Sequence, residues 1–195
     1  MNLANKITIA RILMIPIFIL FFPTYPDWLA EKSVFIQHIN VYGIYYAAAV
    51  FLLASATDKL DGYIARKYNQ ITNLGKLLDP LADKLLISAA LILMVSQQLL
   101  YAWIALIIIG REIIITGIRI VAASQKMALQ ADQYGKIKMV FQVIAIAAIL
   151  LNNRPFSYFT DIPIDQILMY IALVLTVYSG YNYIRNNYRK LKLDT

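Results

Sequence analysis

Long runs of apolar residues, separated by short polar patches, constrain the fold of this chain more than any other feature. A helix needs about 20 apolar residues to cross the hydrocarbon core of a bilayer. Several runs are shorter than this, so we expect helices whose polar ends continue past the apolar stretch. The sequence predicts an all-α membrane protein with six transmembrane helices, forming a single domain over residues 1–195. The six runs are Ile7–Phe22, Val41–Ala56, Leu77–Val95, Leu99–Ala122, Met139–Leu151 and Gln166–Tyr183.

The composition agrees with a membrane protein. Apolar residues make up 61% of the chain and charged residues 15%, whereas soluble domains have about 45–50% and about 25%. The absence of cysteine excludes disulfides and thiolate zinc sites. The single histidine, His38, is expected at the surface in a polar connection. No small-residue cleavage site follows the first run, so we expect it to be a retained span.

The basic residues are divided unequally between the two sides that six spans create. Of the 18 lysines and arginines, only Lys32 and Arg154 fall on the side opposite the termini. Because basic loops mark the cytoplasmic side, both termini are predicted to be cytoplasmic. The net charge of +7 is interpreted as attraction to anionic membrane lipid and phosphorylated substrates rather than to nucleic acid.

Four aspartates flank the connection between the second and third runs. Asp58 and Asp61 are three residues apart, and Asp79 and Asp83 are four apart, so each pair shares one face of its helix. A turn near Asn69–Asn73 would bring the two helices together. Carboxylates gathered at a membrane surface repel one another and need a compensating charge. Oxygen ligands favour hard ions, so the sequence predicts two divalent cations, Mg²⁺ or Mn²⁺, held by these four residues.

The residues between the aspartates suit a phosphorylated substrate. Gly62, Ala65 and Gly75 leave room for a ligand to approach the helix backbones, and Arg66 offers a guanidinium fork for phosphate oxygens. The alternative is that the aspartates are ordinary charges at the cytoplasmic helix ends, paired with neighbouring lysines. The spacing of the whole set favours a functional site.

The stretch from Asp58 to Asp83 resembles the signature of the CDP-alcohol phosphotransferase family, D-x2-D-G-x2-A-R-x8-G-x3-D-x3-D, at every fixed position. The resemblance implies a six-span helical membrane fold, usually a homodimer. It implies transfer of a phosphatidyl-type group from a CDP-linked lipid to an alcohol, with release of CMP. By the same resemblance, Asp58, Asp61 and Asp79 ligate the metals, and Asp83 both ligates a metal and acts as the general base.

The resemblance also extends to the start of the chain. Residues 5–11 resemble the family's opening pattern P-N-x2-T-x2-R, with Ala4 in place of the usual proline. Asn5 and Thr8 would then lie near the nucleotide. The alternatives are a helix N-cap for Asn5 and an ordinary interfacial segment for both. The complete set of residues expected to contact the CDP-lipid is Asn5, Thr8, Gly62, Ala65, Arg66, Thr72 and Gly75.

The fourth run carries charges that a plain membrane helix does not need. Arg111 and Arg119 are eight residues apart on one broad face, and arginines inside a membrane indicate function by default. We expect them to bind the phosphate of a phosphorylated acceptor, with Lys136 and Lys138 completing the pocket and Glu112 orienting an arginine. The alternative is that these side chains extend to the cytoplasmic interface.

This arrangement resembles the bacterial family members that make phosphatidylglycerophosphate, which carry an R-E pair, a later arginine and G-K-x-K-T. Met139 stands where threonine is usual. The resemblance implies CDP-diacylglycerol as the donor and glycerol 3-phosphate as the acceptor, in a bacterial cell membrane with the active site facing the cytoplasm. Inositol phosphate as the acceptor would need similar basic residues. A cation transporter is the alternative of another class, but its carboxylates are expected near the midplane in broken helices.

Overall fold

The computed structural model describes residues 3–23, 25–67, 73–125, 127, 133–154 and 156–188 of the chain. Within these ranges it leaves out the side chains of residues 3–4, 59–67, 73–77, 79 and 133. Every regular element in this part is helical, which confirms the all-α prediction there. The elements are α1 (Leu3–Phe21), α2 (Asp27–Ala30), α3 (Val34–Lys67), α4 (Asn73–Ser96), α5 (Ala102–Ser124), α6 (Gln133–Leu150), the 3-10 turn η1 (Phe156–Tyr158) and α7 (Ile164–Asn187).

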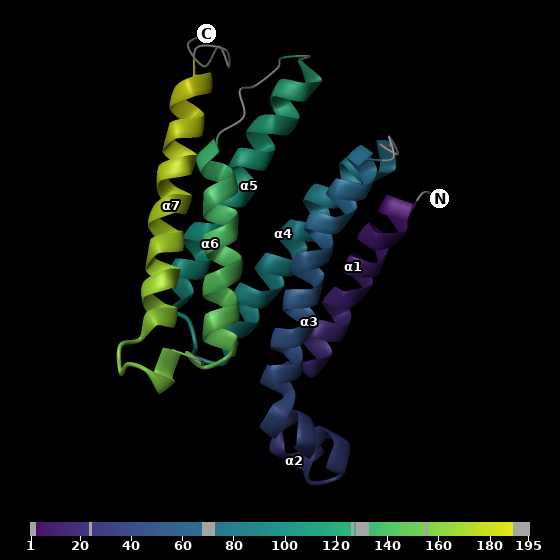
Figure 1. The fold of residues 1–195 in the computed structure, drawn as a ribbon, viewed down its shortest axis with the longest axis vertical. Coiled ribbons are helices and arrows are strands. Elements are labelled where there is room, and N and C mark those ends of the chain that lie inside the picture. Colours follow the sequence, from purple (N-terminus) through teal and green to yellow (C-terminus); the bar gives the residue numbers. More distant parts are fainter. Residues whose placement is uncertain are drawn as a thin grey trace.

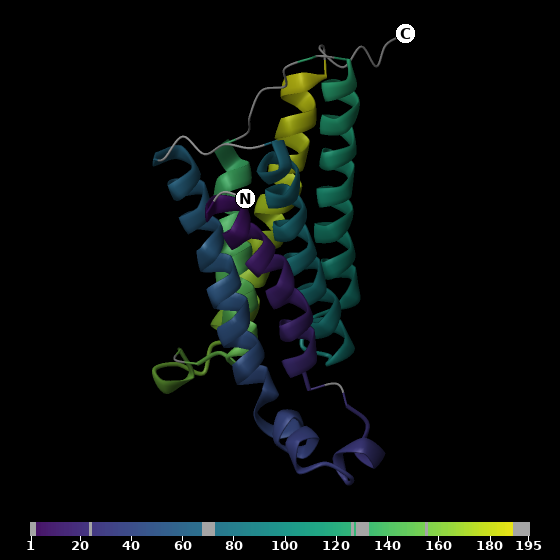
Figure 2. The same cartoon turned by 90° about the vertical axis from the view of Figure 1, so that its right-hand side faces the viewer.

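The six long helices run lengthwise through one bundle (Figure 1). The start of α1, the end of α3, the end of α5 and the end of α7 lie at one end of the bundle, and α2 lies beyond the other end (Figure 2). Within the described residues, two segments are long and apolar enough by themselves to cross a membrane, Val34–Asp58 and Ile164–Asn187. The larger number of six spans stays a prediction.

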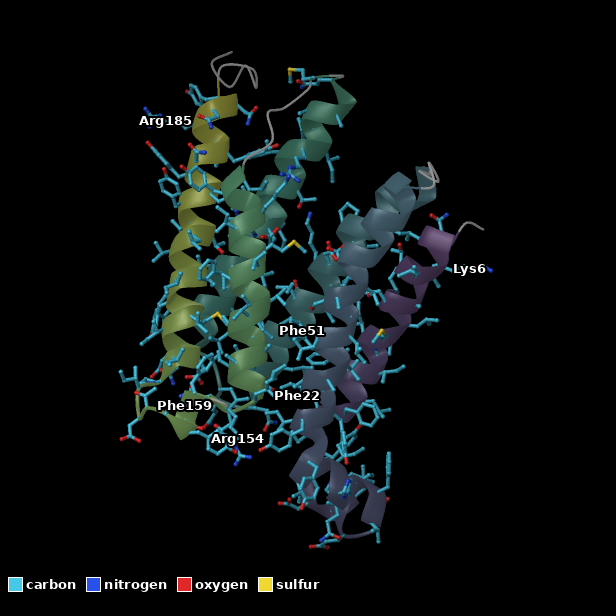
Figure 3. All side chains as sticks on the ribbon, viewed as in Figure 1. Lys6, Phe22, Phe51, Arg154, Phe159 and Arg185 are labelled. Atoms are coloured by element: carbon cyan, nitrogen blue, oxygen red, sulfur yellow. The ribbon has the colours of Figure 1, made fainter. Side chains whose placement is uncertain are left out.

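Packing is strongest between α1 and α3 and between α6 and α7. Phe18, Phe22 and Phe51 are fully buried, with ring centroids 5.7 Å apart for the first two and 6.1 Å for Phe18 and Phe51. Figure 3 shows Phe22 and Phe51 within the bundle, whereas Lys6 points outward near the start of α1. Buried alanines on α3, α4, α5, α6 and α7 allow close approach of their backbones, as is usual between membrane helices.

The contact between α1 and α3 requires a glycine at position 43. A Cβ atom there would overlap the backbone carbonyl of Phe21 and lie 2.9 Å from Cγ2 of Ile39. Any side chain would therefore push the end of α1 away from α3.

Two expectations about helix ends were wrong. α3 begins at Val34, before the apolar run, so His38 lies in a helix and not in a connection. Its ring is exposed, as expected, and forms a hydrogen bond of 2.9 Å with the Tyr46 hydroxyl. Asn5 is already inside α1, so the N-cap interpretation fails. In both cases helical hydrogen bonding continues through polar residues that periodicity alone does not assign to the helix.

We expect Gly43→Ala to lower the free energy of unfolding by about 1–3 kcal/mol, because the added methyl group overpacks the α1–α3 contact. Gly117→Ala in α5 is the matched control, since a Cβ there meets no atom within 4 Å and alanine stabilises a helix by roughly 0.5–1 kcal/mol relative to glycine. Thermal unfolding in detergent micelles measures both. Equal effects of the two substitutions would contradict the close approach at Gly43.

Candidate active site

Arg11 joins three helices at one point of the bundle. Its side chain is fully buried on α1, and Nη1 donates hydrogen bonds to Oδ1 of Asp58 on α3 at 2.9 Å and to Oδ1 of Asp83 on α4 at 2.8 Å. Nε lies 3.4 Å from the hydroxyl of Thr57. A buried cation needs opposite charges around it, and here two neighbouring helices supply one carboxylate each.

The predicted meeting of the two aspartate helices is therefore confirmed for Asp58 and Asp83, which share one nitrogen of Arg11. Asp61 lies three residues further along α3, and Asp79 lies one turn earlier on α4. The side chains of these two residues are outside the described part. Their helices are the two that Arg11 brings together.

Asp58 and Asp83 suit a divalent metal ion by their chemistry. Both offer oxygen ligands, both side chains are partly open, at 28% and 25% exposure, and hard cations prefer such ligands. Among the side chains that the structure describes, no three potential ligands gather. A complete metal site would need further ligands beside these two carboxylates.

A cavity of about 320 Å³ opens beside Asp83. It lies among α4, α5 and α6, and Asp83 and Glu112 are the two carboxylates in its described lining. Five cationic side chains line it as well, so its potential is positive and suits an anionic ligand. These cations are Lys84, Arg111, Arg119, Lys136 and Lys138.

Helix α7 holds both arginines of α5 in place. Nη2 of Arg111 donates a hydrogen bond to Oγ of Ser179 at 2.7 Å. Gly180 leaves room for the Arg111 side chain, since a Cβ there would lie 3.1 Å from its Cγ. Tyr183 lies one turn after Ser179 on α7, and its hydroxyl lies 3.3 Å from Nε of Arg119. The guanidinium carbon of Arg119 lies 5.1 Å from the centroid of the Tyr183 ring. The α7 face of Ser179, Gly180 and Tyr183 thus orients two charges of the cavity.

Two further contacts arrange the cations from α4 and α6. Glu112 forms ion pairs with Lys138 and, at 3.4 Å, with Nη1 of Arg111. Lys84 donates a hydrogen bond to the hydroxyl of Thr116, which in turn donates to the backbone carbonyl of Glu112 at 2.6 Å. Glu112 therefore orients both an arginine and a lysine, whereas the sequence predicted this role for an arginine alone.

The structure brings the predicted acceptor residues together and leaves part of the predicted nucleotide site undescribed. Asp83 lines the same cavity as Arg111, Arg119, Lys136 and Lys138. Asn5 and Thr8 are buried on α1, on the same side as Arg11. Thr72 lies outside the described residues. Helices α3 and α4 carry the remaining predicted positions, whose side chains are not described: Gly62, Ala65, Arg66 and Gly75.

Several residues of the site had been given no role from the sequence. Arg11 was visible as a charge within the first apolar run, which is a signal for function in a membrane protein. Gln142 is likewise a polar residue within the fifth run. Ser179 and Tyr183 carry no such signal, because their contacts depend on how α7 packs against α5.

Residues 1–178 match a family model described as CDP-alcohol phosphatidyltransferase. A Bacillus subtilis protein named CDP-diacylglycerol–glycerol-3-phosphate 3-phosphatidyltransferase is 44% identical over 98% of this chain and 97% of its own. Proteins with the same name from Rickettsia felis (36% identical, 94% of both chains) and Escherichia coli (30% identical, 94% of this chain and 93% of its own) also match.

We expect Arg11→Met to lower the free energy of unfolding by about 1–3 kcal/mol when a chelator is present, because two carboxylates would lose their shared counter-charge. Adding a divalent cation should recover part of this loss, since the cation can take the place of the guanidinium between the carboxylates. The measurement is thermal unfolding in micelles. Lys6→Met, on the exposed side of α1, is the control, and an equal loss there would contradict the role of Arg11.

Proposed function

The chain belongs to the CDP-alcohol phosphatidyltransferase family, and we propose that it transfers the phosphatidyl group from CDP-diacylglycerol to sn-glycerol 3-phosphate, giving phosphatidylglycerophosphate and CMP. Relatives that match almost the whole chain carry the name of this activity. The structural observation that supports a phosphorylated acceptor is the cavity in which a carboxylate, Asp83, lies among five cationic side chains.

The reaction is a direct displacement at phosphorus. The acceptor hydroxyl gives its proton to Asp83, and its oxygen bonds to the phosphorus that carries diacylglycerol. The bond from that phosphorus to the CMP oxygen breaks, and CMP leaves with the electron pair. The protein contributes mainly by positioning the two substrates and by stabilising charge.

Asp83 is suited to be the general base by its place between two parts of the site. It lines the acceptor cavity, and it hydrogen-bonds to Arg11, which also contacts Asp58. A base must be ionised to accept a proton, and the Arg11 guanidinium supplies a counter-charge to the ionised carboxylate.

Two divalent cations, Mg²⁺ or Mn²⁺, would be held by Asp58, Asp61, Asp79 and Asp83. When bound, they would neutralise charge on the phosphates of the donor and on the departing CMP. Asn5 and Thr8 would contact the CDP-lipid from the buried side of α1. The α3–α4 segment would supply the other donor contacts, Gly62, Ala65, Arg66, Thr72 and Gly75.

The acceptor phosphate would be bound by Arg111, Arg119, Lys136 and Lys138. Four cations around one dianionic group give both affinity and orientation. A phosphorylated alcohol of another kind, such as inositol phosphate, would be held by the same charges. Cation transport is disfavoured, because a path for cations would not pass through a cavity lined by five positive side chains.

The long helices α1, α3, α4, α5, α6 and α7 would be the six spans, with both termini and the active site at the cytoplasmic face of a bacterial cell membrane. The positions of three basic residues support this orientation. Figure 3 shows Lys6 and Arg185 toward the end of the bundle where α1 starts and α7 ends, and Arg154 toward the opposite end. The assembly would be a homodimer, with membrane lipid around it.

We expect Asp83→Asn to lower kcat by about 10²- to 10⁴-fold, because the acceptor hydroxyl would lose its proton acceptor. The assay is release of labelled CMP from CDP-diacylglycerol in detergent with glycerol 3-phosphate, beside a Mn²⁺ titration that checks cation binding. Asp165→Asn, in the first turn of α7, is the control. Full activity of Asp83→Asn with cations bound would remove the assignment of the base.

We expect Tyr183→Phe to raise the KM for glycerol 3-phosphate by about 3- to 10-fold, since Arg119 would lose one hydrogen bond and keep the aromatic ring. The KM for CDP-diacylglycerol and kcat should change little. Tyr181→Phe is the matched control, because Tyr181 lies on the same helix and is 62% exposed. Equal effects of the two variants would contradict a role for α7 in orienting Arg119.

The identity of the acceptor is tested by comparing CMP release with glycerol 3-phosphate, inositol phosphate and serine.

A further inference from the structure

Gln142 is a buried polar residue in the acceptor cavity that the proposed reaction does not use. It lies on α6, is 3% exposed and belongs to the cavity lining. Its amide nitrogen has no hydrogen-bond partner among the described residues. A buried amide donor without a partner is unfavourable for the folded protein, so its place at a cavity points to a polar group that enters from outside.

The position of Gln142 relative to the charges indicates which group that is. Gln142 follows Lys138 by four residues on α6, so the two side chains share one face of the helix. Both line the cavity together with Asp83. If the cations hold the phosphate of glycerol 3-phosphate and Asp83 takes the proton of the attacking hydroxyl, both ends of the acceptor are bound. The secondary hydroxyl between them is the one polar group of the acceptor that still lacks a partner.

We propose that Gln142 binds this secondary hydroxyl and makes the site selective for phosphorylated alcohols that carry a second hydroxyl on the carbon next to the one that bears the attacking oxygen. The inference rests on the proposed function. A primary amide suits the task, because it can donate to the hydroxyl oxygen and accept from the hydroxyl proton. Sites built to bond a substrate hydroxyl reject analogues without it, since their buried polar groups are then left unpaired.

The test compares two acceptors, glycerol 3-phosphate and 3-hydroxypropyl phosphate, which lacks only the secondary hydroxyl. The full-length protein in detergent is assayed for CMP release from CDP-diacylglycerol as wild type, Gln142→Met and Val140→Ala. Methionine keeps the length of glutamine without its polar group. Val140 lies on the same helix, is 43% exposed and is not part of the cavity lining.

The wild type should prefer glycerol 3-phosphate by about 10- to 100-fold in kcat/KM, the range expected for one buried hydrogen bond. Gln142→Met should reduce this preference to about 3-fold or less by losing activity with glycerol 3-phosphate alone. Val140→Ala should keep it. The unfolding temperature of Gln142→Met should be equal to or above that of the wild type, because an unpaired amide is replaced by an apolar group.

Three outcomes would overturn the proposal, and a fourth would overturn its premise. A wild type that does not discriminate between the acceptors contradicts it, as does a Gln142→Met variant that keeps the full preference, which is the result expected if a bound water is the partner of the amide. An equal loss with both acceptors, accompanied by a lower unfolding temperature, would show a structural role. Absence of wild-type CMP release with glycerol 3-phosphate would instead refute the proposed function.

Discussion

The buried guanidinium of Arg11 is the interaction on which the arrangement of the site depends. A fully buried cation is tolerated in a bundle of apolar helices only where carboxylates surround it. Asp58 and Asp83 meet this need from two different helices, so the ion pairs fix α1, α3 and α4 relative to one another where Arg11 lies. The aromatic contacts of Phe18, Phe22 and Phe51 fix α1 against α3 elsewhere in the bundle. Asp58 and Asp83, which stabilise the contact with Arg11, are also residues to which the proposed function gives a chemical role.

The contacts around the cavity leave it with a net positive charge. Ser179 and Tyr183 hold Arg111 and Arg119 through hydroxyl groups, which accept hydrogen bonds without neutralising the guanidinium. Among the ion pairs of the described residues, those that involve cations of α5 and α6 are both formed by Glu112. An excess of positive charge therefore remains for an anionic ligand, and the repulsion between the cations is relieved when such a ligand binds.

The sequence predicted the parts of the site that follow from spacing along a single helix. Asp58 and Asp83 were expected on facing helices, and they meet at Arg11. Arg111 and Lys138 were expected in one pocket, and they line one cavity with Asp83. Contacts that depend on helix pairing were not predictable in this way, and neither were the helix ends. The hydroxyl of Tyr183 reaches Arg119 only because α7 lies against α5, and no local pattern encodes that choice.

Asp83 lies where two parts of the candidate site meet. It is the carboxylate that, among the described residues, both contacts Arg11 and lines the acceptor cavity. A displacement at phosphorus needs the attacking oxygen and the donor phosphate within contact distance of each other. In the proposed reaction, a base that lies between the other aspartates and the acceptor cavity would achieve this, because the hydroxyl that it binds would already lie beside the donor. A small shift of α4 relative to α1 would move Asp83 away from one of its two neighbours. In the proposed reaction, the hydrogen bond between Arg11 and Asp83 would therefore serve the chemistry as well as the fold.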